Sequence, residues 1–117
     1  MISLEQIAAA NDLTLEEVQV PEWGGSVFIR TLSSAVKDRF DRLVADRSEA
    51  QAFRAILVAF AACDAHGQPA FPDSVAAAKV LEEKSALVVG RLFDVAARLN
   101  GLSAIEEAAK NSEASPT

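Results

Sequence analysis

Several residue types are scarce in this 117-residue sequence, and each shortage excludes a class of protein. The single cysteine, Cys63, cannot form an internal disulfide, which indicates a reducing compartment. The longest apolar stretch, residues 55–63, is far shorter than the roughly 20 residues of a membrane span. The N-terminus lacks the basic region and the following apolar stretch of a secretory signal. We therefore expect a cytoplasmic protein.

Basic residues are also scarce. The chain has 11 lysines and arginines against 17 acidic residues, and the bases are interleaved with acids instead of forming a run. Affinity for nucleic acid comes mostly from Lys and Arg that neutralise phosphates, and anionic lipid surfaces attract basic segments. A net charge of −6 therefore argues against nucleic acid and against membranes as partners. It suits a protein that stays soluble while it holds something hydrophobic or basic.

The sequence offers little material for catalysis or metal binding. Cys63 and His66 form a CxxH pair, but zinc requires three or four ligands, and the chain has no second Cys or His. A Cys–His nucleophile is conceivable, but nothing suggests an oxyanion site, and a semi-buried Cys63 beside a solvated His66 is the simpler interpretation. Gly24 and Gly25 do not belong to a phosphate-binding motif. We predict no catalytic, cofactor-binding or metal-binding residues and expect a protein that acts by binding other proteins.

What the chain does have is alanine and helical periodicity. Half of its residues are apolar, and many of these are alanine, which favours helices because it loses no side-chain entropy there. We predict a mainly α fold: a small helical domain of about five to six short helices with one N-terminal β-hairpin. It forms a single domain over residues 1–110, and a disordered tail follows over residues 111–117.

The hairpin is predicted between residues 17 and 32. Two runs rich in β-branched residues flank a Pro/Gly turn. The strand positions are Val18, Val20, Val27 and Ile29. We expect Gly24 and Gly25 to supply the positive φ angles of the reversal. A two-stranded hairpin is marginal in water, so one of its faces must lie on helices or on a partner.

Capping residues and apolar spacing mark the helices. Ser3 with Gln6 has the form of a capping box for a short first helix through Ala10. Ser48 with Gln51 repeats this form and opens the helix that we expect at the centre of the core. The apolar stripe of that helix is Phe53, Ile56, Leu57 and Phe60. Four more helices are predicted: one capped by Ser33 or Ser34, one from Asp73 or Ser74 to Leu81, one from Lys84 to a C-terminal cap at Gly101, and a short last one after Ser103. Residues 63–74 are predicted to form a loop.

Three aromatic residues are candidates for partner binding. Trp23 lies at the expected hairpin tip, where it either folds back over the hairpin or is an exposed anchor of the kind that dominates interfaces. Phe71, in the middle loop, is either a plug at the edge of the core or a contact. Phe28, on the second strand, completes the set.

The sequence contains VPEWGGSVFIRTLS at residues 20–33, CDAHGQPAF at residues 63–71 and LFDVAARLNGLS at residues 92–103. Taken in order, these three segments resemble the tail assembly chaperones of long-tailed (siphovirus-type) bacteriophages. Residues 20–33 (VPEWGGSVFIRTLS) resemble the family's VPEWGG turn and the strand after it, and a charged helix follows at residues 37–40. Residues 63–71 (CDAHGQPAF) resemble its D-x-x-G-x-x-x-F turn, and residues 92–103 (LFDVAARLNGLS) resemble its LF-x-x-A-x-x-LNGLS ending. The resemblance covers roughly residues 14–105, with Ser26 standing where many relatives have a larger or charged residue.

The resemblance implies a non-enzymatic role in building a phage tail in the host cell cytoplasm. Such proteins bind the tape-measure protein, keep it soluble, help to recruit the tail tube protein, and are absent from the finished virion. Many also have a second, longer form made by a programmed frameshift. Because one copy cannot cover a long target, we expect a homo-oligomer.

Two other interpretations stay open. The first is a structural subunit, such as a minor tail protein or a head–tail joining protein, which would be retained in the particle. The second is a small enzyme that uses Cys63 and His66, which would need a thiol far more reactive than a free cysteine.

Overall fold

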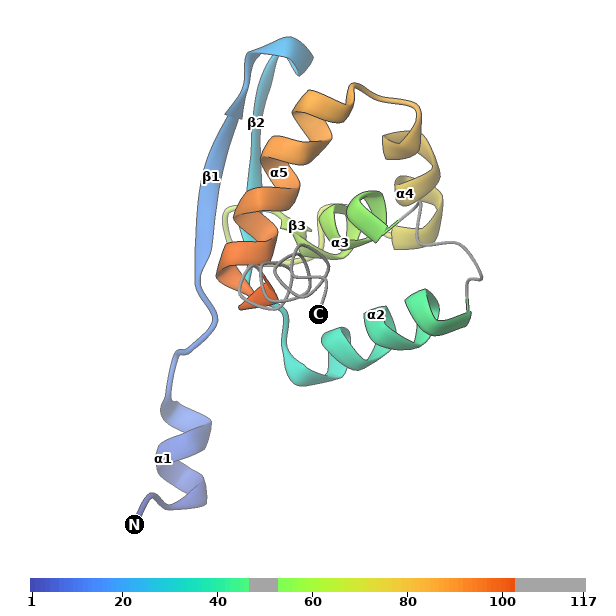
Figure 1. Ribbon diagram of the computed structural model, residues 1–117. Coiled ribbons are helices and arrows are strands. Elements are labelled where there is room, and N and C mark those ends of the chain that lie inside the picture. Colours follow the sequence, from blue (N-terminus) through green and yellow to red (C-terminus); the bar gives the residue numbers. More distant parts are fainter. Residues whose placement is uncertain (47–52, 103–117) are drawn as a thin grey trace, which may run out of the picture.

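The computed structural model describes residues 1–46 and 53–102, and within these it is mostly helical (Figure 1). Five helices and a three-stranded antiparallel sheet make up the described part of the chain. In chain order they are α1 (Leu4–Ala9), β1 (Leu15–Val20), β2 (Gly25–Arg30), α2 (Ser34–Asp46), α3 (Phe53–Ala61), β3 (Ala62–Cys63), α4 (Ser74–Glu82) and α5 (Ala86–Leu99). The mainly α fold with an N-terminal hairpin is confirmed, although the sheet is larger than predicted. The capping box at Ser48, the helix after Ser103 and the tail at 111–117 lie outside the described residues.

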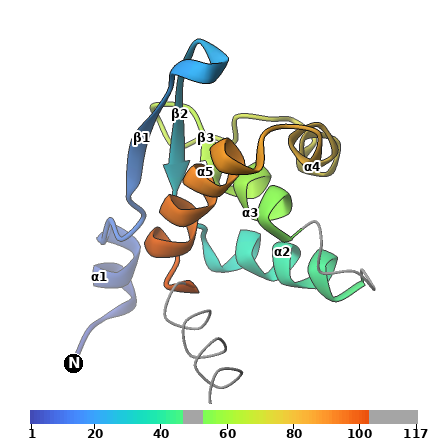
Figure 2. The ribbon, with the colours of Figure 1, turned by 45° about the horizontal axis from the view of Figure 1, so that its top comes forward.

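The hairpin pairs β1 with β2 in the register that alternation of apolar residues predicts. Val18 lies opposite Val27, and Glu16 opposite Ile29. Val18, Val20 and Ile29 are buried, so one face of the hairpin belongs to the core. That face is covered by α5, which crosses the sheet in both views of the ribbon (Figures 1 and 2).

The reversal between β1 and β2 uses one glycine in the left-handed region. Pro21–Trp23 form a single 3₁₀ turn, and Gly24 follows it with φ 81° and donates its N–H to the Pro21 carbonyl. Gly25 has no positive φ, so the expectation for that residue was wrong. The reason is that the 3₁₀ turn and Gly24 complete the reversal, and Gly25 already begins β2.

A third strand, which the sequence did not predict, extends the sheet. β3 begins directly where α3 ends, and it pairs with β2 so that Phe28 lies opposite Cys63 and Ile29 opposite Ala62. Cys63 in turn forms an isolated bridge with Pro69. Residues 63–74 are therefore not wholly a loop, since their first residue is part of the sheet.

The core is built around α3. This helix contacts α2, α4 and α5, and Ile56 and Leu57 are almost fully buried, as the predicted stripe requires. Phe53 and Phe60, from the same stripe, are partly buried and pack against this core. Local caps position the surrounding helices: Ser33 accepts the N–H of Val36, Asp73 caps α4 and Ser85 caps α5.

The helix α1 stands apart from the rest of the molecule (Figures 1 and 2). It has the predicted capping box between Ser3 and Gln6, but it buries no residue. We call residues 1–14, which comprise α1 and its connection to β1, the N-terminal arm. Its exposed apolar side chains are Met1, Ile2, Leu4, Ile7 and Leu13.

Because the arm buries nothing, its apolar residues should not contribute to stability. We expect Ile7→Ala to change the free energy of unfolding by less than about 0.5 kcal/mol. The smaller truncation Ile56→Val, in the core, should cost about 0.5–1.5 kcal/mol. Urea unfolding followed by circular dichroism compares the two; a larger loss for Ile7→Ala would mean that the arm packs on the body.

Candidate partner-binding surface

The hairpin tip presents Trp23 to solvent. Trp23 ends the 3₁₀ turn, and 39% of its surface remains exposed. Of the two arrangements considered for it, the structure therefore has the side chain only partly covered by the protein's own atoms. A partly exposed Trp on a defined turn offers a large contact area at low cost in conformational entropy.

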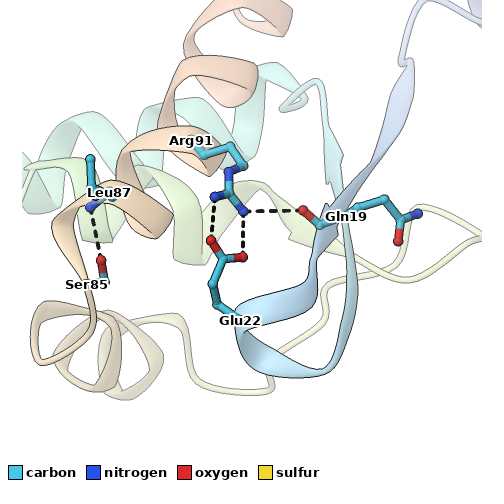
Figure 3. Close-up of polar contacts among 5 residues, drawn as sticks. All are labelled: Gln19, Glu22, Ser85, Leu87 and Arg91. Carbon is cyan, nitrogen blue, oxygen red and sulfur yellow. Dashed lines mark hydrogen bonds and ion pairs between the residues drawn. The ribbon is translucent and has the colours of Figure 1, made fainter.

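An ion pair ties this tip to α5 (Figure 3). The Arg91 guanidinium donates to both carboxylate oxygens of Glu22, at 2.9 and 2.6 Å, and one of its nitrogens is 3.5 Å from the Gln19 carbonyl oxygen. Hydrogen bonding from Arg91 lowers the pKa of Glu22 to about 2. Seven residues further along α5, Arg98 makes a second such contact, with Glu16 at 2.7 Å. The turn that carries Trp23 is thus held at a fixed place on α5.

The lowered pKa of Glu22 predicts acid sensitivity of the tip. The stabilisation of the tip by the Glu22–Arg91 ion pair is complete above the ordinary pKa of 4.5 and is lost as the pH falls towards about 2, because protonation removes the charged acceptor of Arg91. The fluorescence of Trp23, which is the only tryptophan, should shift to longer wavelength over this range.

Two variants give the controls for this titration. Arg91→Met should show the shifted emission already at neutral pH and lack the acid step. Arg98→Met removes only the contact with Glu16 and should keep the step. An unchanged acid step in Arg91→Met would contradict the role given to the Glu22 pair.

Phe28 lies on the other face of the sheet. Side chains alternate along β2, so Phe28 points to the face of the sheet opposite to that of the buried Ile29. Its neighbours on the adjacent strands are Glu17 and Cys63. Phe28 is half-buried. We call the side of the hairpin that faces away from α5 the outer sheet face; it is formed by Leu15, Glu17, Gln19, Ser26, Phe28 and Arg30.

Phe71 lies beyond the bridge between Cys63 and Pro69. It is half-buried, and the preceding Ala70 donates its N–H to the Ala62 carbonyl at 3.0 Å. The aromatic ring contacts within residues 1–46 and 53–102 join Phe40, Phe53, Phe60 and Phe93 in the core. The three candidate residues therefore stand at three separate places, and ring contacts do not bring them together.

A pocket lies where the arm meets the sheet. It has a volume of about 470 Å³. Its walls come from the arm, the start of the hairpin and the loop after β3, and include Asn11, Leu13, Leu15, Arg30, His66 and Gln68. Arg30 shapes this end of the sheet, because its guanidinium donates to the Phe60 carbonyl at 3.0 Å and to the Gly67 carbonyl at 3.2 Å.

Cys63 and His66 do not have the features of a catalytic pair. Cys63 is buried, not semi-buried as expected, and burial raises the pKa of its thiol, which disfavours the nucleophilic thiolate. His66 is exposed, and its backbone N–H is held by the Asp64 carboxylate at 2.8 Å. Within residues 1–46 and 53–102, no three His, Cys, Asp or Glu side chains gather to hold a metal ion. In the same residues, no helix is long and apolar enough to span a membrane.

Comparison with known proteins identifies a similar structure. The structure of the tail assembly chaperone of bacteriophage HK97 matches this chain with a TM-score of 0.56 and 29% sequence identity, over 82% of this chain and 91% of that one. The resemblance to the tail assembly chaperone family is confirmed. No protein-family model and no curated protein matches the sequence.

In the segments that resemble the family, the distinctive residues make turns and polar contacts that hold the fold together. In the first segment, Gly24 closes the turn and Glu22 pairs with Arg91. In the second, Asp64 accepts two backbone N–H groups of its own turn, in which Gly67 has φ 82°. These residues have structural roles: the first two position the hairpin tip, and the other two form the turn after β3.

The third segment contributes Asn100, whose side-chain amide joins α5 to the hairpin. Its oxygen accepts the Leu32 N–H at 2.7 Å, and its nitrogen donates to the carbonyls of Arg30 and Ala96 at 3.2 and 2.9 Å. From the sequence, Asn100 is predicted only to end a helix together with Gly101. The signal was present in the family's LNGLS ending, but the partners in and after the hairpin, Arg30 and Leu32, lie 70 and 68 residues away.

Proposed function

We propose that the protein is a phage tail assembly chaperone that binds the tape-measure protein, keeps it soluble, and promotes assembly of the tail tube without remaining in the virion. The structural likeness to the HK97 tail assembly chaperone carries this proposal. The exposed apolar side chains of the arm and the hairpin tip agree with it, because they offer surface for another polypeptide. The work would take place in the host cell cytoplasm.

The absence of a reactive centre from the described residues favours a binding role over an enzymatic one. The thiol of Cys63 is buried with a raised pKa, and His66 is solvated. A chaperone needs neither a reactive thiol nor a catalytic histidine. Recruitment of the tail tube protein, in a longer frameshifted form or otherwise, and assembly of several copies along one tape-measure chain belong to the same proposal.

Co-expression tests the proposal. The tape-measure protein, produced alone, should be found mostly in the insoluble fraction, because its apolar helical segments are uncovered. With this protein present, it should move to the soluble fraction and co-purify with it. If the tape-measure protein stays insoluble and no complex forms, the chaperone role is wrong.

A structural subunit is the second candidate function. It would remain in the particle as a minor tail or head–tail joining protein. Mass spectrometry of purified virions separates the two, since a chaperone is expected to be missing and a subunit to be present at a fixed copy number.

A further inference from the structure

The N-terminal arm is an apolar helix without a partner in the described part of the chain. Leu4 is 80% exposed and Ile7 59% exposed, and they lie three residues apart on α1. A six-residue helix is not stable alone in water, because nucleation costs more than so few hydrogen bonds return. Leu13 and Leu15 continue the exposed apolar surface from the arm to the first residue of the sheet. This surface is therefore suited to contact another molecule.

The outer sheet face continues this surface. Neighbouring strands lie about 4.8 Å apart, so the two strands of this face, β1 and β2, together span about 10 Å, close to the about 10–12 Å of an α-helix with its side chains. Half-buried Phe28 lies in the middle of this face, and the pocket of about 470 Å³ lies at the end where the face meets the arm. The pocket is lined by residues of both the arm and the outer sheet face, and we call these three parts together the docking strip.

The negative charge along this strip favours a partner with basic residues. Residues 1–29 contain five acidic residues and no Lys or Arg, so they carry nearly all of the net charge of −6. Arg30 is the base on the outer sheet face, and its guanidinium donates to the carbonyls of Phe60 and Gly67. Two of these acids, Glu16 and Glu22, are paired with arginines of α5. The other three are Glu5, Asp12 and Glu17, and no basic side chain in residues 1–46 and 53–102 pairs with them.

We propose that the arm and the outer sheet face together dock an amphipathic helix with basic flanks from a partner protein. This inference rests on the proposed function, in which the tape-measure protein supplies the helix. The apolar side of the helix would cover Leu4, Ile7 and Phe28, and its basic flanks would meet the three unpaired acids. The arm of a second copy is a poor occupant, because it carries the same negative charge and no base.

Two synthetic peptides probe the strip on the full-length protein. One is an 18-residue amphipathic helix of Leu and Lys, and the other replaces each Lys by Glu. Isothermal titration calorimetry should show binding of the Leu/Lys peptide, weakening as salt is added, and no measurable binding of the Leu/Glu peptide. Equal or tighter binding of the Leu/Glu peptide would overturn the proposal.

A charge variant and a matched control locate the contact. The combined substitutions Glu5→Gln, Asp12→Asn and Glu17→Gln should weaken binding of the Leu/Lys peptide about tenfold, since each exposed ion pair contributes about 0.2–1 kcal/mol. The control carries Asp38→Asn, Glu83→Gln and Asp94→Asn, which change the net charge equally at exposed positions on α2, at the end of α4 and on α5. It should bind within about twofold of the parent. Equal weakening in both variants would mean that only overall charge matters.

An apolar variant and the tape-measure protein complete the test. Leu4→Ser combined with Ile7→Ser should weaken binding of the Leu/Lys peptide without changing the circular dichroism of the body. If these substitutions instead change the sedimentation coefficient of the protein alone and leave peptide binding intact, the arm contacts a second copy and the proposal is wrong. If a tape-measure fragment binds all variants equally, the chaperone role stands and this docking strip does not. If the fragment binds none, including the parent, the chaperone role itself fails.

Discussion

Phe40→Ala is expected to lower the free energy of unfolding by about 3–5 kcal/mol, which is a large part of the 5–15 kcal/mol typical of a domain. Phe40 is the only fully buried residue of α2 among the described residues, and 2% of its surface is exposed. Its ring packs edge-on against Phe53 and Phe60, at centroid distances of 5.5 and 6.0 Å. Its removal leaves a cavity between α2 and α3 and takes away the main anchor of α2.

Urea unfolding followed by far-ultraviolet circular dichroism measures this effect. Phe71→Ala is the matched control, because Phe71 is half-buried in a loop and its loss should cost clearly less. A cost below about 1 kcal/mol for Phe40→Ala would mean that α2 is held mainly by other contacts.

Asn100→Ala is expected to destabilise the protein by about 2–3 kcal/mol. The side-chain amide satisfies the Leu32 N–H and the Arg30 carbonyl, and Leu32 is buried, so the substitution leaves backbone groups without partners where water has little access. Asn11→Ala removes an amide of the same type from an exposed position and should cost less than about 0.5 kcal/mol.

Asn100→Asp tests the hydrogen-bonding explanation directly. The carboxylate can still accept the Leu32 N–H, but it cannot donate to the carbonyls of Arg30 and Ala96. We therefore expect no rescue at neutral pH, and partial recovery when acid protonates the new carboxyl group. Full stability of Asn100→Asp at neutral pH would show that only the Leu32 contact matters.

The features that could be predicted from the sequence are those that neighbouring residues determine. Ser3 caps α1, Ser33 caps α2 and Asp73 caps α4, because a capping side chain reaches a backbone N–H two or three residues away. The apolar stripe of α3 and the alternation of Val18 and Val20 predicted which faces are buried, since period alone determines them.

The features that could not be predicted depend on contacts between distant residues. β3 has two residues and no pattern of its own, and it exists because the end of α3 meets β2. The pair of Glu22 and Arg91 joins residues 69 apart, and nothing near either one indicates the other. The isolation of α1 is of the same kind, because the capping box predicts a helix but not what the helix packs against.

The candidate site was predicted as three aromatic residues, and the structure places them in different settings. Trp23 is on the tip, Phe28 is in the outer sheet face, and Phe71 is half-buried beyond β3. The arm exposes more apolar surface than any of them, but the sequence does not single it out, because apolar residues at helical spacing predict a buried face. The part of the three aromatic residues in partner binding, like that of the arm, stays a prediction.

Sedimentation velocity of the purified protein with a tape-measure fragment tests the central claim most directly. We predict that the two sediment together as one faster boundary, with several copies of this protein on each fragment, and that the fragment no longer pellets as aggregate. Two independent boundaries, with the fragment aggregating as it does alone, would contradict it.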